Sequence, residues 1–134
     1  MKAYLGRRYH FVASHRLHTD AYDAARNRDV YGKCNNPYGH GHNYTIEVVM
    51  SGPVDAKTGM VCDMAELDAF AGKNVLAVFD HMNLNTLKVF EHQVPTAENL
   101  CIEVYNIFKG FSDARLERVR VEETNNNSFE YAGE

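Results

Sequence analysis

One stretch of the sequence limits the fold more than any other. From His40 to Met50, apolar and aromatic residues occupy alternate positions, a pattern typical of a β-strand with one buried face. Residues two apart on a strand point to the same side, so His40 and His42 lie next to each other with only Gly41 between them. Two imidazoles on a rigid backbone form half of a metal site. The chain is therefore expected to build a sheet that carries paired histidines where one strand begins.

A second alternating stretch, residues 3–15, supplies a partner strand. His15 ends this stretch on the same face as the apolar residue Phe11. Two strands joined by one long loop suit an antiparallel pair. Such pairing would bring His15 close to His40 and His42.

Together these histidines predict a zinc site. Three neutral imidazoles leave the ion its full positive charge and one position open, as in catalytic rather than structural zinc sites. The alternative is that His15, His40 and His42 are separate strand histidines, each hydrogen-bonded to its own neighbours. The polar segment between the strands, 17–33, with a short helix around 21–28, is the kind of long loop that often carries function.

The second half of the chain predicts two helices. Asp63 is suited to cap the first, with Glu66 placed to reach back to the amide of the cap, and apolar residues at helical spacing continue to Phe79. Thr96 is suited to cap the second helix. Glu98 is then a first-turn acid that interacts favourably with the helix dipole.

Alternation returns at 116–124, and a short last strand follows at 129–131. The order is strand, strand, helix, helix, strand, strand (ββααββ). This order predicts an α+β fold, a four-stranded antiparallel sheet with two helices on one face. Residues 1–134 have the length of a single domain.

Composition argues against several kinds of partner. The formal net charge is −4 and no basic run is present, so we expect neither a nucleic-acid partner nor an anionic membrane surface. No apolar run approaches the length of a bilayer span. Cys34, Cys62 and Cys101 are odd in number and have no paired spacing, which predicts reduced thiols in a cytoplasmic protein.

Three further positions have both a chemical and a purely structural interpretation. Cys34, in a polar loop before the histidine pair, is either a base or nucleophile whose pKa a nearby cation lowers, or a small buried residue. Asp80 and His81 form either a proton relay or a favourable helix end. Glu123, on a strand face with valines, is either an anchor in a pocket or the end of a strand turning to solvent.

Six segments spread along the chain resemble the 6-pyruvoyl-tetrahydropterin synthase and 6-carboxytetrahydropterin synthase family. They are Phe-Val-Ala-Ser-His-Arg-Leu at 11–17, Gly-Lys-Cys-Asn-Asn-Pro-Tyr-Gly-His-Gly-His-Asn-Tyr at 32–44, Thr-Gly-Met-Val-Cys-Asp at 58–63, Asp-His-Met-Asn-Leu-Asn at 80–85, Pro-Thr-Ala-Glu-Asn-Leu at 95–100 and Glu-Thr-Asn-Asn-Asn at 123–127. The most specific element is His-Gly-His-Asn-Tyr after a cysteine.

The resemblance implies the tunnelling fold (T-fold), in which three subunits close a barrel and two trimers stack into a homohexamer. It implies that His15, His40 and His42 hold zinc and that Cys34 is the general base. The substrate class that it implies is a pterin triphosphate, 7,8-dihydroneopterin triphosphate, from which triphosphate is eliminated while the side chain tautomerises.

The resemblance also implies roles for the remaining candidates. Asp80 and His81 complete the proton relay, with His81 contributed across a subunit boundary. Glu123 counts among the catalytic residues and anchors the guanidine-like edge of the pterin, where a carboxylate can accept two parallel hydrogen bonds. Glu98 and Thr96 line the site.

Two alternatives remain beside the pyruvoyl enzyme. One is 6-carboxytetrahydropterin synthase of queuosine biosynthesis, which uses the same substrate and also releases acetaldehyde; the loop from Cys34 to His40 resembles the pyruvoyl type. The other is a non-catalytic zinc- or pterin-binding module, which would not need Cys34 or His81. The triphosphate requires cations, for which Lys33, Arg8 and Arg16 are candidates by location only.

Overall fold

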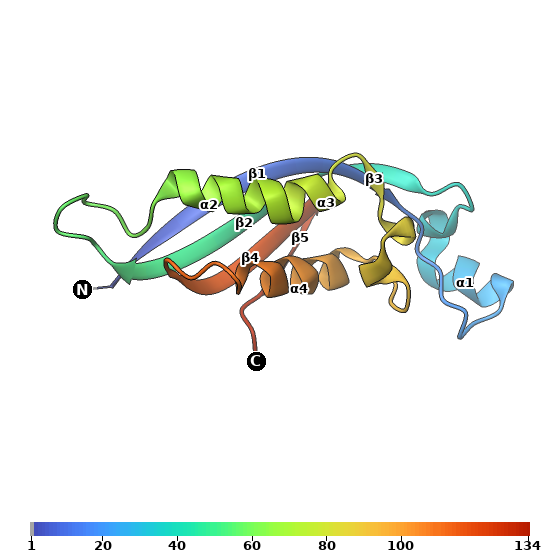
Figure 1. Ribbon diagram of the computed structural model, residues 1–134. Coiled ribbons are helices and arrows are strands. Elements are labelled where there is room, and N and C mark those ends of the chain that lie inside the picture. Colours follow the sequence, from blue (N-terminus) through green and yellow to red (C-terminus); the bar gives the residue numbers. More distant parts are fainter. Residues whose placement is uncertain (1) are drawn as a thin grey trace.

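The computed structural model describes residues 2–134 and contains one five-stranded sheet (Figure 1). The strands run in the spatial order β3-β1-β2-β4-β5. Their bounds are β1 Lys2–His15, β2 His40–Pro53, β3 Met82–Asn83, β4 Arg115–Thr124 and β5 Asn127–Tyr131. The prediction of an α+β fold is confirmed. The prediction of four antiparallel strands is wrong in detail, because the sheet has five strands and one of them is parallel.

The added strand is β3, which pairs in parallel with the outer edge of β1, so the sheet is mixed. β3 has two residues, too few to leave any alternation in the sequence. It is held in place by the residue before it, His81, whose backbone N–H donates to the carbonyl of Val12. β3 therefore forms through backbone hydrogen bonds next to the end of α3, and the alternation of side chains could not predict it.

The long antiparallel pair of β1 and β2 is the central feature of the sheet. Its register sets His15 opposite His40, Ala13 opposite His42 and Phe11 opposite Tyr44. This confirms that the two predicted strands pair and bring the histidines together. β4 continues the sheet on the other side of β2, also antiparallel.

Helices occupy the connections. They are α1 Ala24–Tyr31, α2 Met64–Ala71, α3 Ala77–Phe79 and α4 Ala97–Phe108, with 3-10 turns η1 Gly32–Asn35, η3 Leu84–Thr86 and η4 Lys88–Phe90. α2 runs into α3 through the π-helical turn η2 Gly72–Leu76, so the predicted helix from Asp63 to Phe79 is present with a widened turn inside it. Within residues 2–134, no helix combines the length and the apolar character of a membrane span.

The caps of the two long helices agree with the sequence in part. Asp63 accepts hydrogen bonds from the amides of Ala65 and Glu66, and Thr96 accepts one from Asn99. The reciprocal bond expected from Glu66 is replaced, because the amide of Asp63 donates to the carboxylate of Asp113. The helix start is thereby tied to the segment before β4.

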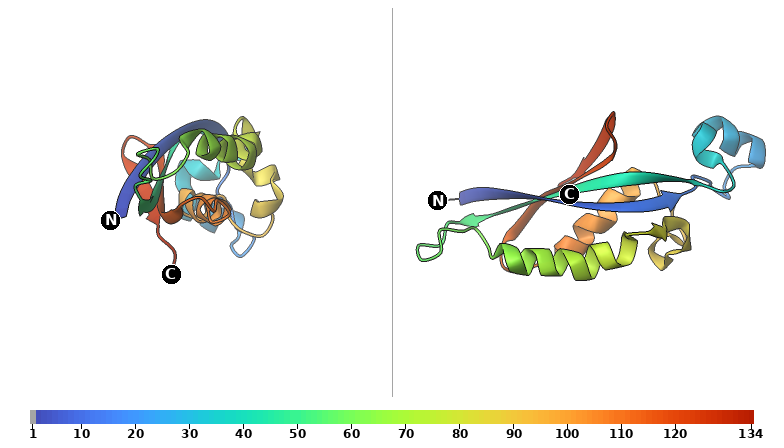
Figure 2. Two further views of the ribbon diagram at one scale, coloured as in Figure 1. Left: turned by 60° about the vertical axis from the view of Figure 1, so that its left-hand side comes forward. Right: turned by 90° about the horizontal axis from the view of Figure 1, so that it is seen from above.

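Both long helices pack on one face of the sheet and enclose the core (Figures 1 and 2). The residues of β2 that point to this face are Tyr44, Ile46, Val48 and Met50, all at most 1% exposed. Their partners across the core include Leu67 and Val75 from the α2 side and Leu100 and Val104 of α4. Burying one such aliphatic side chain contributes about 1.5–3 kcal/mol, so the alternation along β2 largely determines where the helices lie.

Candidate functional site

The three predicted ligands form one cluster at the end of the helix-covered face. His15 is the last residue of β1, and His40 and His42 are the first residues of β2 on the same face as the core. Their candidate ligand atoms all lie within 4.8 Å of one another. Nε2 of His15 is 3.2 Å from Nε2 of His40. The cluster is therefore a direct continuation of the period-two pattern that builds the core.

The chain fixes the orientation of the His15 ring. Its Nδ1 lies 2.8 Å from the carbonyl oxygen of Pro95, the residue before the cap of α4. A carbonyl only accepts, so Nδ1 carries the proton and Nε2 presents its lone pair to the cluster. The hydroxyl oxygen of Tyr44 lies 3.3 Å from the same Nδ1. A carbonyl partner behind the ring is the usual way in which a metal-binding histidine is oriented.

Burial favours the uncharged form of the histidines in the cluster. His15 is 1% exposed, and burial lowers the pKa of both His15 and His42, which favours their neutral forms. Nε2 of His42 is buried without a hydrogen-bond partner in the described part of the chain. An unpaired buried ring nitrogen and inward-facing lone pairs are what a metal ion would satisfy.

Glu123 of β4 completes this end of the face. Its carboxylate oxygens lie 4.0 Å from Nε2 of His15 and 3.9 Å from Nε2 of His42. The Glu123 side chain is 16% exposed, so it does not turn to solvent. Three imidazoles and one carboxylate in a half-buried site can hold a divalent cation and, beside it, a ligand with hydrogen-bond donors.

Cys34 lies in the loop that folds back toward the cluster. It is in η1, its carbonyl accepts a hydrogen bond from the amide of Leu17, and it lines one pocket together with His40. Gly39 allows the loop to approach: its φ is +73°, and a Cβ there would lie 2.9 Å from the carbonyl oxygen of His15.

Without a metal ion the surroundings of Cys34 disfavour the thiolate. Burial raises the pKa of the thiol, and the negative charge of Glu123 raises it further. The prediction of a lowered Cys34 pKa depended on a cation next to the thiol. A bound cation at the histidines would oppose the field of Glu123 and shift the Cys34 pKa downward.

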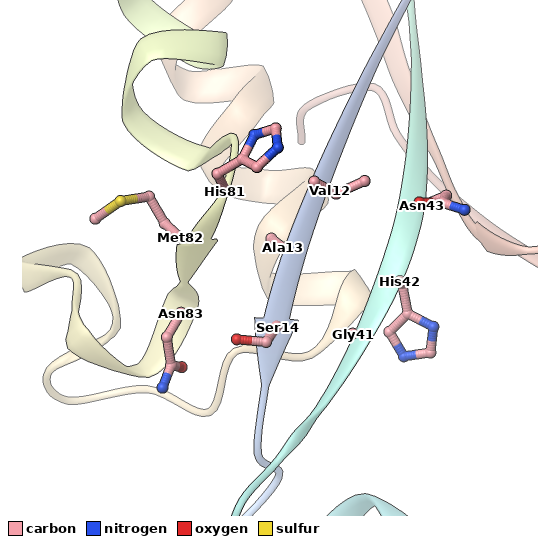
Figure 3. Close-up of a pocket in the computed structure, with 9 residues that line it drawn as sticks. All are labelled: Val12, Ala13, Ser14, Gly41, His42, Asn43, His81, Met82 and Asn83. Atoms are coloured by element: carbon pink, nitrogen blue, oxygen red, sulfur yellow. The ribbon is translucent and has the colours of Figure 1, made fainter.

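Asp80 and His81 lie next to β3, away from the three histidines. Nδ1 of His81 is 3.0 Å from the Asp80 carboxylate, which also accepts a hydrogen bond from the amide of Val12. The bond from Val12 and the neighbouring His81 lower the Asp80 pKa. Figure 3 shows His81 on the β3 side of β1, whereas His42 projects from the far side of β2. His81 lines a cavity of about 380 Å³ across β1 and β2, which His42 also lines.

Thr96 and Glu98 follow Pro95 at the start of α4. The hydroxyl of Thr96 caps the helix by accepting from the amide of Asn99, and Glu98 is exposed in the first turn. Both are therefore near the carbonyl that orients His15. Sequence reasoning missed Pro95 and Tyr44 as supports of His15; the parity of Tyr44 with His42 was a usable signal, whereas a backbone carbonyl leaves none.

Comparisons with known proteins identify the family of the chain. The model of the 6-pyruvoyl tetrahydropterin synthase family matches residues 4–134. The chain is 39% identical over 133 residues to 6-pyruvoyl tetrahydrobiopterin synthase of Poecilia reticulata, covering 98% of this chain and 90% of that protein. It is 38% identical over 135 residues to the human protein of the same name, covering 99% and 93%.

Its fold is similar to that of a solved structure, 6-pyruvoyl tetrahydropterin synthase of Caenorhabditis elegans. The TM-score is 0.95 at 38% sequence identity, and the superposition covers 100% of this chain and 97% of that one. Sequence and fold thus agree over the whole of the matched range. The chain belongs to the 6-pyruvoyl tetrahydropterin synthase family.

Proposed function

We propose that this chain is a zinc-dependent 6-pyruvoyl-tetrahydropterin synthase, a carbon–oxygen lyase that eliminates triphosphate from 7,8-dihydroneopterin triphosphate. The observation that carries the proposal is the cluster of His15, His40 and His42 beside Glu123, in a chain of this family. Two nitrogens on a tetrahedral zinc ion at about 2.05 Å would be about 3.3 Å apart. The 3.2 Å between His15 and His40 supports that fit.

The overall reaction needs neither water nor an external reductant. The substrate loses the elements of triphosphoric acid. Its two side-chain carbinols become carbonyls and release four electrons, of which two reduce the dihydropterin ring and two convert the carbon that carried triphosphate into a methyl group. Bound zinc would supply a Lewis acid that acidifies the side-chain hydroxyl and adjacent C–H groups. The protein must then move protons and hold the pterin.

Cys34 takes the role of the base. As a thiolate it removes a proton from the substrate side chain, which permits the C–O bond to triphosphate to break. Glu123 takes part at the same end of the site and accepts hydrogen bonds from the pterin or its side chain. We assign Thr96 and Glu98, at the start of α4, to the surroundings of the bound pterin.

Asp80 and His81 relay protons across a subunit boundary. Among residues 2–134, Asp80 and His81 bond to each other and to β1 on its outer side, and no hydrogen bond or ion pair joins either of them to the histidine cluster, which supports a role at the site of a neighbouring subunit. This arrangement agrees with a homohexamer built as a dimer of trimers. We propose further that residues 1–134 act as one domain and that the enzyme is cytoplasmic, in keeping with three unpaired cysteines.

Product analysis tests the proposal. Zinc-loaded protein is incubated with 7,8-dihydroneopterin triphosphate, and the pterin and any two-carbon fragment are identified by mass spectrometry. The pyruvoyl product without acetaldehyde is expected. The carboxy product with acetaldehyde would transfer the protein to queuosine synthesis, and unchanged substrate despite bound zinc would indicate a binding module.

The variant Cys34→Ala separates catalysis from binding in the same assay. It removes the base and leaves the three histidines in place, so turnover is expected to be lost while zinc content stays at the parental value. Equal turnover in Cys34→Ala and parent protein would remove Cys34 from the mechanism.

A further inference from the structure

A pocket beside the histidine cluster has an unusual set of charges. It is a cavity of about 600 Å³ between the end of β1, α1 and the η1 loop, and both Cys34 and His40 line it. It is also lined by His18 and by three cations, Arg16, Arg28 and Lys33, and no carboxylate from residues 2–134 lines it. In a chain with a net charge of −4, this collects positive charge at one place.

These three cations are not engaged by acidic groups. Among residues 2–134, none of them has a carboxylate oxygen within 4.0 Å, whereas Arg7 and Arg8 are paired with Asp68 and Glu47. The Nε–H of Arg16 donates to the carbonyl of Asn35, which holds the guanidinium against the Cys34 loop. Arg28 and Lys33 are exposed. The pocket therefore offers two guanidinium groups and one ammonium to an anion.

We propose that this pocket binds the triphosphate of the substrate, with Arg16, Arg28 and Lys33 as its cationic ligands. The identity of the ligand depends on the proposed function; the pocket itself does not. Guanidinium groups bind phosphate oxygens in pairs, and an ammonium adds a point charge. Arg8, one of the candidates from the sequence, is excluded from this role because it pairs with Glu47 on the face of the sheet away from the helices.

The position of the pocket suits a leaving group. His40 is shared between the pocket and the metal cluster, so a ligand whose side chain meets the histidines extends directly into the cationic cavity. Negative charge grows on the bridging oxygen as the C–O bond breaks, and fixed cations stabilise it. The role of the long polar segment between β1 and β2 follows, because its elements α1 and η1 bring Arg28 and Lys33 to the site.

The test uses inorganic triphosphate as a probe and one pair of matched variants. Arg28→Gln removes a pocket cation from α1, and Arg26→Gln removes a cation from the same helix outside the pocket, where Arg26 packs over Tyr22. Binding to zinc-loaded protein is measured by calorimetry at fixed ionic strength. Zinc content is measured afterwards, because triphosphate itself binds metal ions. A double variant, Arg28→Gln with Lys33→Gln, enlarges the effect.

Arg28→Gln is expected to weaken triphosphate binding about tenfold, and the double variant more, with Arg26→Gln at the parental value. Binding of phosphate-free 7,8-dihydroneopterin should stay unchanged. In turnover the double variant should raise KM for the triphosphate substrate. Equal triphosphate affinity in parent and double variant, or an equal loss in Arg26→Gln, would overturn the assignment.

The two proposals fail in different ways. If the parent protein binds triphosphate through Arg28 and Lys33 but turns over no pterin, the pocket stands as an anion site and the proposed function fails. If turnover is normal and KM is the same in parent and double variant, the pocket does not hold the triphosphate of the substrate. Loss of zinc in the double variant would show that Arg28 and Lys33 maintain the structure around the histidines, which would overturn the assignment.

Discussion

The Nδ1 atom of His15 lies 2.8 Å from the carbonyl oxygen of Pro95, a residue 80 positions further along the chain. This bond connects the end of β1 with the start of α4 and fixes which nitrogen of His15 faces the cluster. The imidazole of His15 has little freedom to rotate, because its backbone is paired with β2 and its Nδ1 is bonded to the residue before the cap of α4. Orientation by an outer partner is worth about 10–100-fold in metal affinity in known sites.

Removing a ligand should abolish metal binding without unfolding the chain. His42→Ala is expected to lose bound zinc and turnover, because one imidazole of three is gone, and the loss in affinity should exceed the roughly 10–100-fold typical of outer partners. His10→Ala is the control, since His10 contacts Thr45 on the exposed face of the same strand pair. Zinc per chain after dialysis is the measurement. Zinc retained by His42→Ala at the parental affinity would contradict the three-histidine site.

The charge of Glu123 should control the reactivity of Cys34. Burial raises the pKa of Cys34 and the Glu123 carboxylate adds to it, so in metal-free protein Glu123→Gln should lower that pKa and speed alkylation by iodoacetamide at pH 8. Cys101 is an internal reference, because burial raises its pKa to about 12. Alkylation of each cysteine is followed by peptide mass spectrometry. An unchanged or slower rate at Cys34 would show that the field of Glu123 does not reach the thiol.

Much of this architecture could be predicted from the sequence because it follows from periodicity. Alternation placed β1 and β2, their pairing brought His15 to His40 and His42, and Asp63 and Thr96 marked the helix starts. These features depend on side-chain type at regular spacing.

The features that could not be predicted depend on backbone groups or on neighbours far along the chain. β3 consists of two residues, and the group that accepts the hydrogen bond from His15 is the backbone carbonyl of Pro95, which no side-chain type marks in the sequence. The pKa of Cys34 depends on Glu123, which only the folded sheet brings near. The position of Arg28 in the cationic pocket depends on the fold of the polar loop.

The ion pair between β1 and α2 should make stability depend on pH. Arg7 donates two hydrogen bonds to Asp68 and Tyr9 a third, and the Arg7 and Tyr9 bonds hold the pKa of Asp68 below its ordinary value. A carboxyl with a depressed pKa adds stability above its unfolded pKa of about 3.9, and this is lost as pH falls through the folded value. Asp68→Asn should therefore lower the urea midpoint at pH 7 and make little difference at the lowest accessible pH. Glu91→Gln, which changes an exposed carboxylate, is the control.

The backbone of His81 offers a last prediction. Its φ is +61°, in the left-handed region that costs most residues about 1–2 kcal/mol, and glycine far less. His81→Ala and His81→Gly both remove the imidazole and its contact with Asp80, so both are expected to lose turnover alike. His81→Gly should nevertheless be more stable than His81→Ala by about 1 kcal/mol, measured by urea unfolding. If the two variants were equally stable, the backbone would have relaxed, and the geometry at the end of α3 would not be what holds this side chain in place.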